Sequence, residues 1–439
     1  MKEKEKELFD FVRENDIQKA EKLLKDGVDV NAREFSRGTR ILHYAKTSEA
    51  AKMLIDNGAE VNAKSRDNTT PLHEAVRRNL PEVVSVLLEN GAEVNEANSI
   101  GEIPLHLTKS SETTKLLVEH GSEINAADSR EETPLFKISK LSVFEILIKA
   151  GADITIKNWR GETVLHSIIP FVMDSEPVDA GPGKEQGKRK RSDGYQIIER
   201  LIEMGLDVNE KDKDYKTPLF VAARHNQTAI IKLLIDNKAE VNTKDKYGNT
   251  PLHEVKSKKT AALLLKNGAD INAKNKYGET ALHKSNLEDN IELSRYFIES
   301  GADINIICEG MNSGTPVFSV KSPEMLKLMI ENNADINMRD SSGQTLLHEF
   351  VQKTEFELVK ILLEYNVDIN AKDNKGRTPL FYASVLDIVE ALIKAGALTN
   401  IADKYGKKPV DFFKGRYFNR SLKLDKEGNI TVKRGKYDI

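Results

Sequence analysis

The chain has 439 residues, and its 66 basic and 69 acidic side chains nearly cancel to a formal net charge of −3. This balance argues against a nucleic-acid or membrane partner for the chain as a whole. The single cysteine, Cys308, excludes an intrachain disulfide and a cysteine-rich zinc site. The longest uncharged runs have 11 residues, well short of the roughly 20 that span a bilayer as a helix. We therefore expect a cytoplasmic protein, with a nuclear location or secretion by a signal-independent route as alternatives.

The first segment, residues 1–32, predicts a helical unit that closes the N-terminal end. Its charged start runs directly into Leu8, Phe9 and Val12, which have helical spacing. Charged side chains surround Leu23 and Leu24, as expected of an end unit whose outer side faces water.

A helical hairpin that begins at Thr70 is the clearest of a series. The Thr70 side chain can cap a helix that opens with Pro71, where the missing backbone N–H costs nothing. A second helix is predicted from about Pro81 to Gly91, because glycine accepts the left-handed conformation that ends a helix.

Two motifs repeat this hairpin along nearly the whole chain. The first is Thr-Pro-Leu-His or a close variant, which begins at Thr70, Thr133, Thr217, Thr250, Thr280, Thr345 and Thr378. The second is a turn similar to Gly-Ala-Asp-Ile-Asn, whose last residue is Asn31, Asn62, Asn95, Asn125, Asn209, Asn242, Asn272, Asn305, Asn337, Asn370 or Asn400, with Thr155 as the only substitute. The motif Thr precedes the turn by 21 residues in some units and by 18 in others. The shorter units lack nearly one helical turn, which we expect to be missing at the junction between the two helices.

These motifs resemble the ankyrin repeat, whose period is about 33 residues and whose signature contains Thr-Pro-Leu-His-x-Ala. The resemblance covers roughly residues 5–412. It implies an all-α repeat solenoid, an ankyrin array of helix pairs joined by β-hairpin-type finger loops. It also implies that the motif histidines link neighbouring repeats, and that a partner binds to the fingertips and the concave face of the first helices. Proteins of this kind serve as regulators in their own cells or as secreted effectors.

The first residue of each Gly-Ala-Asp-Ile-Asn turn should adopt a left-handed conformation. It is Gly in nine of twelve units, and Asn333 and Asn366 are the next most tolerant residues. Lys238 is the exception. A left-handed lysine at this position should cost roughly 1 kcal/mol of folding free energy relative to Gly.

Residues 174–194 interrupt the series, and their Gly, Pro and charged composition predicts an inserted flexible loop. Lys188, Arg189, Lys190 and Arg191 form a basic patch within it. One interpretation is a nuclear-import signal or a tether for an acidic partner, and the other is a solvated loop.

Four successive fingers carry an aromatic residue, namely Trp159, Tyr215, Tyr247 and Tyr277. Exposed rings of this kind are frequent binding hot spots, although each ring could instead pack along the neighbouring finger. The same fingers carry basic residues, which include Arg160, Lys213, Lys246 and Lys276. This edge is predicted to suit a partner with acidic patches and apolar anchors.

The last segment, residues 413–439, mixes basic and aromatic residues, a pattern that can bind nucleic acid. The alternative is a C-terminal cover in which Phe412 and Phe413 pack on the last helices. A short hairpin is predicted within Ser421 to Lys433, with Gly428 and Asn429 as turn residues.

No catalytic constellation is apparent in the sequence. His73-Glu74 begins like the zinc-protease signature, but Arg77 stands where a second His is required.

We therefore interpret the chain as a monomeric, non-enzymatic scaffold or adaptor without a cofactor, which binds another protein. The alternative is a nucleic-acid-binding or nuclear-targeted ankyrin protein that uses the basic loop and tail. The expected divisions are a capping repeat (1–32), ankyrin repeats (33–173 and 195–412), the inserted loop (174–194) and a basic tail or cap (413–439).

Overall fold

The computed structural model describes residues 3–172, 191–308, 314–413, 422–424 and 430–432. The chain divides into two compact units, unit 1 (Met1–Glu240) and unit 2 (Val241–Ile439). In the described ranges, no helix is both long enough and apolar enough to cross a membrane.

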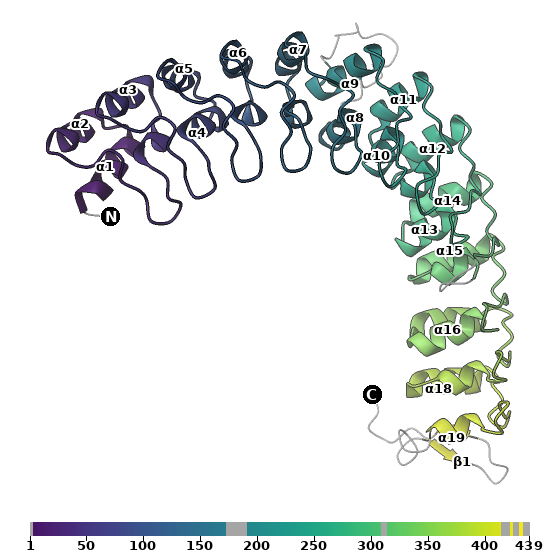
Figure 1. Ribbon diagram of the computed structural model, residues 1–439. Coiled ribbons are helices and arrows are strands. Elements are labelled where there is room, and N and C mark those ends of the chain that lie inside the picture. The colour runs from purple at the N-terminus through teal and green to yellow at the C-terminus, as the bar shows by residue number, and fades with distance from the viewer. Residues whose placement is uncertain (1–2, 173–190, 309–313, 414–421, 425–429, 433–439) are drawn as a thin grey trace, which may run out of the picture. The chain divides into compact units, whose positions relative to one another are not determined.

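Unit 1 is a stack of helix pairs that follow one another in chain order, with loops that project between successive pairs (Figure 1). Its α-helices are α1 (Glu3–Glu14), α2 (Ile17–Lys25), α3 (Ser48–Asp56), α4 (Pro71–Arg77), α5 (Pro81–Glu89), α6 (Ser111–Glu119), α7 (Leu141–Lys149), α8 (Val164–Ile168), α9 (Asp193–Glu203), α10 (Pro218–Arg224) and α11 (Thr228–Asp236). Its 3₁₀ turns are η1 (Ile41–Tyr44), η2 (Pro104–Leu107), η3 (Pro134–Lys137) and η4 (Ile169–Phe171).

Unit 2 repeats this arrangement and ends in a short hairpin. Its α-helices are α12 (Lys258–Lys266), α13 (Ala281–Leu287), α14 (Ile291–Glu299), α15 (Pro323–Glu331), α16 (Leu346–Lys353), α17 (Phe356–Leu363), α18 (Leu386–Lys394) and α19 (Pro409–Phe413). Its 3₁₀ turns are η5 (Pro251–Glu254), η6 (Pro316–Ser319) and η7 (Pro379–Tyr382). Strands β1 (Leu422–Leu424) and β2 (Ile430–Val432) pair antiparallel, with Lys423 opposite Thr431, which confirms the predicted hairpin.

The hairpin predicted at Thr70 is confirmed in detail. The Thr70 hydroxyl accepts the N–H of His73 at 3.4 Å, and Pro71 opens α4. Helix α5 begins at Pro81 and ends before Gly91, whose φ is +84°. Local capping therefore defines both helices before any packing is considered.

The two unit lengths correspond to two forms of the first helix. Units with the longer spacing begin with an α-helix of seven or eight residues, namely α4, α10, α13 and α16. Units with the shorter spacing begin with a four-residue 3₁₀ turn, namely η3, η5, η6 and η7. The missing residues thus come from the first helix itself, so the predicted place, the junction between the helices, was wrong. The chain becomes extended directly after the 3₁₀ turn, as at Val255, and Ser257 then caps α12.

The left-handed caps are confirmed at all nine glycines, at Asn333 (φ +64°) and at Lys238 (φ +71°). The prediction for Asn366 was wrong, because its φ is not positive. Helix α17 ends at Leu363, and the N–H of Val367 donates to the nearby carbonyl of Tyr365 at 2.8 Å. In the repeat of Asn333, by contrast, the equivalent N–H of Ala334 reaches back to Met329.

The apolar faces of the helices form the core of each unit. The largest fully buried side chains include Phe9, Phe144 and Phe220 in unit 1 and Phe297 and Phe350 in unit 2. Burial of one such side chain contributes on the order of 1.5 to 3 kcal/mol. Leu8 and Val12 are also buried, as the sequence predicts for the first unit.

The C-terminal cover is only partly as predicted. Phe413 is buried, whereas Phe412 stays 42% exposed with its ring 5.7 Å from that of Phe381.

Candidate functional site

In the described part of the chain, nine finger loops are each shaped by an Asp or Asn side chain that accepts hydrogen bonds from its own backbone. In the finger of Asn158, the Oδ1 atom accepts the N–H groups of Arg160 and Glu162, each at 3.0 Å. The same pair of bonds, to the residues two and four positions later, occurs at Asn98, Asp128, Asp212, Asp245, Asn275, Asp340, Asp373 and Asp403. The tip is therefore pre-organised by local hydrogen bonds.

Neighbouring tips are joined by backbone hydrogen bonds. The N–H of Trp159 donates to Arg130 O (3.0 Å), that of Lys213 to Arg160 O (2.8 Å), and that of Lys276 to Tyr247 O (2.9 Å). Gly248, which follows Tyr247 in its finger, is left-handed and has little room for a side chain. A Cβ on Gly248 would lie 2.9 Å from the backbone nitrogen of Lys276. Fingertip residues thus have a fixed spacing within each unit.

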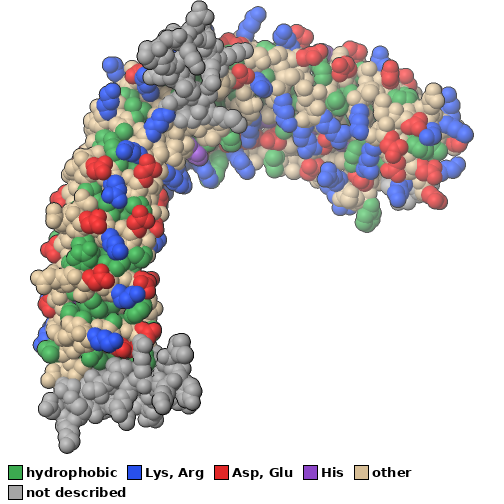
Figure 2. All heavy atoms as spheres, turned by 180° about the vertical axis from the view of Figure 1, so that it is seen from behind, with side chains coloured by type: hydrophobic (Ala, Val, Ile, Leu, Met, Phe, Trp, Pro, Cys, Tyr) green, Lys and Arg blue, Asp and Glu red, His purple; other side chains and the backbone are tan. Residues whose placement is uncertain are grey.

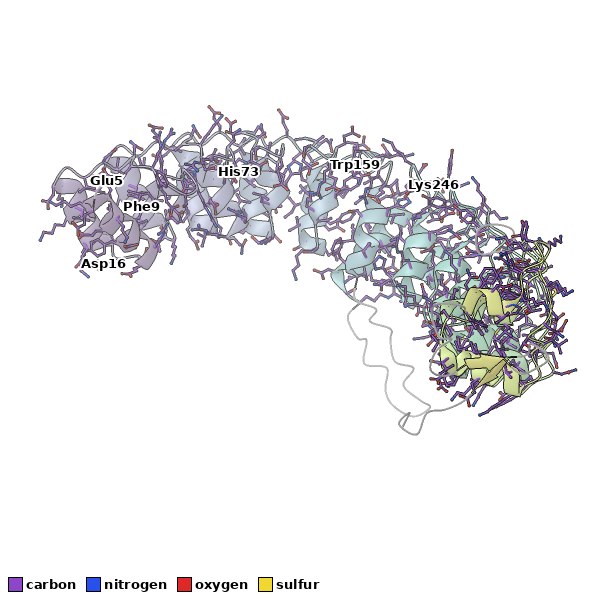
Figure 3. All side chains as sticks on the ribbon, turned by 90° about the horizontal axis from the view of Figure 1, so that it is seen from below. Glu5, Phe9, Asp16, His73, Trp159 and Lys246 are labelled. Carbon is purple, nitrogen blue, oxygen red and sulfur yellow. The ribbon has the colours of Figure 1, made fainter. Side chains whose placement is uncertain are left out.

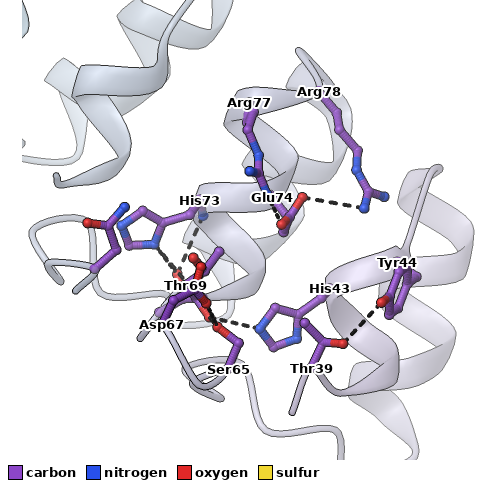
Figure 4. A network of polar contacts seen from close by, with 12 residues as sticks. Thr39, His43, Tyr44, Ser65, Asp67, Thr69, His73, Glu74, Arg77 and Arg78 are labelled. Atoms are coloured by element: carbon purple, nitrogen blue, oxygen red, sulfur yellow. Dashed lines mark hydrogen bonds and ion pairs between the residues drawn. The ribbon is translucent and has the colours of Figure 1, made fainter. Parts of the chain in front are cut away.

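Six of the seven motif histidines also link a helix pair to the next finger through Nε2. These bonds, 2.9 to 3.1 Å long, join His43 to Thr69 O, His73 to Glu102 O, His106 to Glu132 O, His166 to Lys216 O, His253 to Glu279 O and His348 to Arg377 O. Figure 4 shows the first two of these histidines. The role that the resemblance implies is confirmed for these six, which leaves them committed to the fold.

His283 departs from the pattern. Its Nε2 is buried and makes no hydrogen bond of acceptable geometry to any part of the chain that the structure describes. Burial lowers the pKa of His283 to about 4, although the backbone of Gly314 is close enough to favour the protonated form.

The four predicted aromatic residues are all substantially exposed. Trp159 and Tyr215, in unit 1, are 46% and 57% exposed, and Tyr247 and Tyr277, in unit 2, are 43% and 51% exposed. Figure 3 labels Trp159 and also Lys246, which lies next to Tyr247 in the sequence. Whether these rings contact a partner stays a prediction.

The rings do not occupy equivalent positions of their fingers, which the sequence analysis missed. Only Tyr247 and Tyr277 share a position, the second after the Asp or Asn of the turn. Trp159 is one position earlier, and Tyr215 takes the left-handed position that Gly161 and other glycines occupy elsewhere, with a φ of +61°.

Two of the predicted basic residues lie over these rings, and a third contacts the backbone beside one of them. The guanidinium of Arg160 is 4.8 Å from the Trp159 ring centroid, and the Lys246 ammonium is 5.0 Å from that of Tyr247. The Lys213 ammonium donates to the Trp159 carbonyl. Trp159 and Tyr247 are thus each paired with a cation from their own finger, an arrangement that desolvation strengthens.

A groove of about 580 Å³ lies in unit 1 between fingers and first helices. Its apolar wall comes from η3 and η4 and from the residues beside them, which are Phe136, Ile138, Ile168, Pro170, Phe171 and Val172. Arg130 and Arg160 line it from two adjacent fingers. The Lys137 ammonium is already paired with Asp128 and Glu132. Among the described residues, Arg130 and Arg160 have no carboxylate partner, so they are the cations that a ligand can reach.

Most of the predicted basic patch, Lys188, Arg189 and Lys190, lies outside the described residues. Arg191 is exposed, forms an ion pair with Glu199, and stacks on the Tyr195 ring at 4.8 Å. Ser192 caps α9, which begins at Asp193, so Asp193 and Gly194 are helical and do not belong to the predicted loop. Most of the basic tail also lies outside the described residues.

The most exposed of the rings that sequence reasoning missed are two phenylalanines. Phe35, in the first finger, is 85% exposed, and Phe171, beside the groove, is 84% exposed. Several other fingertips lie shortly before a motif histidine, and Phe35 likewise lies shortly before the first one, His43. This position in the sequence could have identified Phe35 as a fingertip residue. No group of three His, Cys, Asp or Glu side chains that could hold a metal occurs in the described ranges.

A family model described as ankyrin repeats in three copies matches residues 8–98, 190–275 and 317–403. A second model, ankyrin repeats in many copies, matches residues 256–298. No curated protein matches the chain. The matched ranges cover more than half of the sequence and agree with the helix pairs, fingers and histidine links described above. The chain therefore belongs to the ankyrin-repeat family, whose repeats are generally protein–protein interaction modules.

Proposed function

We propose that this chain is a non-enzymatic scaffold or adaptor that binds a partner protein through its fingertips and first helices. The observation that carries the proposal is the groove of unit 1, where an apolar wall lies beside two arginines that have no carboxylate partner among the residues that the structure describes. Trp159, whose ring stacks on Arg160, lies next to the groove in the same finger.

The groove favours a partner segment with an apolar side chain next to an acidic one. The apolar side chain would displace water from the wall that Phe136 and Ile168 form. A carboxylate would then reach Arg130 or Arg160 in a bidentate hydrogen bond. The charged groups of the groove that are already paired with each other, such as Lys137 and Glu132, need no ligand.

Chemical crosslinking of the full chain in cell lysate, followed by mass spectrometry, tests the proposal. We expect crosslinks from a partner to concentrate on the two fingers that line the groove, residues 128–132 and 158–162. Trp159 is the only tryptophan, so its fluorescence emission reports directly on docking of the purified partner.

Affinity should fall about tenfold for Arg130→Glu combined with Arg160→Glu, which corresponds to about 1.4 kcal/mol. Arg295→Glu, an exposed substitution on α14, is the matched control and should leave it unchanged. Crosslinks confined to the outer helices, or unchanged affinity in the double variant, would overturn the proposed surface.

A further inference from the structure

The first finger of unit 1 presents an apolar anchor on an ordered tip. Phe35 is 85% exposed, although the finger around it is held by backbone pairing. Arg33 and Arg40 form an antiparallel bridge, and the N–H of Glu34 donates to Thr39 O at 2.8 Å. A large ring that is exposed on a fixed loop can be desolvated by a partner at little entropic cost.

Three guanidinium groups belong to this tip and the next one. Arg33 and Arg37 are exposed and have no ion pair within the described part of the chain. Arg66, from the second finger, donates its backbone N–H to Arg37 O and its Nη1 to Ser36 O, both at 3.0 Å. Its side chain lies over Gly38, where a Cβ would be 2.9 Å from the Arg66 Cγ. Arg66 is therefore fixed beside the tip that carries Phe35.

The first helices continue the positive surface. The Tyr44 ring has Arg13 of α1 on it at 4.3 Å and Arg78, the C-cap of α4, at 5.6 Å. Arg77 and Arg78 both pair with the single carboxylate of Glu74 (Figure 4). Burial lowers the pKa of Arg78, and the positive charges of Arg13 and Arg37 lower it further. The tip and the first helices thus form one arginine-rich surface, in which Arg13 is paired with Glu34, and Arg77 and Arg78 share Glu74.

We infer that this N-terminal arginine surface, comprising Arg13, Arg33, Arg37, Arg66, Arg77, Arg78 and Phe35, binds an acidic segment of a partner protein that carries a large apolar side chain. The apolar side chain would pack on Phe35, and its acidic neighbours would pair with Arg33, Arg37 and Arg66. The inference rests on the proposed function of partner binding, but it uses a surface separate from the groove at Arg160.

The carboxylates within the surface favour a peptide over a nucleic acid. Glu34 accepts hydrogen bonds from Arg13 (2.8 Å) and Tyr44 (2.6 Å), and Glu74 lies between Arg77 and Arg78. A phosphate backbone has a charge at every nucleotide and would be repelled where it passes these groups. A peptide can place carboxylates at the arginines and neutral residues opposite Glu34 and Glu74.

A random peptide library displayed on phage, selected on the full chain, tests this inference. The Arg33→Glu, Arg37→Glu double variant is present in excess in solution, so that peptides bound elsewhere are removed. We expect the recovered peptides to combine two or more Asp or Glu residues with Phe, Leu, Ile or Trp. A fluorescein-labelled peptide of the recovered sequence is then titrated in fluorescence anisotropy.

Binding of this peptide should weaken about tenfold in the double variant and in Phe35→Ser. Arg295→Glu is the charge control, and Trp159→Ala should leave the affinity unchanged. Circular dichroism melts verify that each variant folds. Failure to recover acidic peptides, or equal binding by the double variant, would overturn the inference and leave the groove untouched.

Two further probes identify a different occupant. A single-stranded oligonucleotide and vesicles that contain phosphatidylserine are titrated under the same conditions. Binding of either one more tightly than the peptide, with loss in the double variant, would contradict the peptide assignment. Loss of peptide binding in Trp159→Ala alone would instead assign the peptide to the groove.

Discussion

The Nδ1 atom of His73 lies 2.8 Å from the hydroxyl oxygen of Thr70. The backbone N–H of Thr70 also donates to this Nδ1 atom, at 3.2 Å. These donors leave Nδ1 without a proton, so Nε2–H donates to the carbonyl of Glu102. Where the motif carries Phe in place of His, the hydroxyl loses its partner. Among the described residues, it has no hydrogen-bond partner at Thr133, Thr217, Thr315 and Thr378, where it is buried.

This pairing predicts opposite effects for the same substitution in two repeats. Thr70→Val should lower the free energy of unfolding by about 1 kcal/mol, because it removes the hydroxyl that serves both His73 and the start of α4. Thr133→Val should be neutral or stabilising, since it removes a buried hydroxyl without a partner. Urea denaturation of both variants measures the difference. Equal destabilisation by the two would show that the Thr–His bond has no special weight.

Stability should fall as the pH decreases below about 6.5. Burial lowers the pKa of all seven motif histidines, and that of His283 falls to about 4. Below the unfolded-state pKa of about 6.5 the unfolded chain binds more protons than the folded chain, so acid favours unfolding. His283 alone should contribute a loss of about 2 kcal/mol at pH 5.

Thermal melts between pH 5 and 8 measure this dependence. His283→Gln should flatten it below pH 6.5, because a neutral side chain takes up no proton. Lys238→Gly, which changes no histidine, is the control and should retain the full slope. A melting temperature of wild type that stays constant from pH 7 to pH 5 would contradict the prediction.

Lys238→Gly should raise the melting temperature. Lys238 has a φ of +71°, a conformation that costs a non-glycine residue on the order of 1 kcal/mol. Asn366→Gly is the matched control at the corresponding position of another repeat. Asn366 is not left-handed, so glycine there should give no gain and only add conformational entropy to the unfolded chain. Calorimetry of both variants tests the pair, and a gain at Asn366 alone would refute the cap argument.

Thr155→Asn should stabilise unit 1. Asn125 links two repeats by donating to Gly151 O at 3.1 Å and accepting the N–H of Asp153 at 2.9 Å. Thr155 stands at the next such position, and its hydroxyl bonds to the carboxylate of its own neighbour Asp153. An asparagine should restore both links to the following repeat and contribute about 1 kcal/mol.

Hydrogen exchange across residues 205–209 measures the effect of Thr155→Asn locally. Asn125→Thr is the reverse substitution and should lose a similar amount. If Thr155→Asn increases exchange, the repeat after the insertion does not present its backbone in the same way.

The face in Figure 2 shows why composition alone did not locate a binding surface. Acidic and basic side chains are intermixed over it, in keeping with a net charge of −3. Aromatic residues identified four tips from the sequence, but the position of Tyr215, which matches that of Gly248 two residues before the motif Thr, went unnoticed. Phe35 was also overlooked, because the first finger precedes a motif that begins with Arg40 and not with Thr.

The sequence by itself determined the repeat, the helix starts at residues such as Pro71, and the left-handed caps. These features depend on hydrogen bonds and backbone sterics within a few residues, so the local sequence is sufficient to predict them. Only the tertiary structure decided which charged side chains gather on one surface. Arg13 and Arg78 meet at Tyr44, and Arg66 lies on Gly38, because stacking brings together residues about 30 or more positions apart. Neither the groove at Arg160 nor the surface around Phe35 follows from one repeat, since each requires side chains from neighbouring repeats.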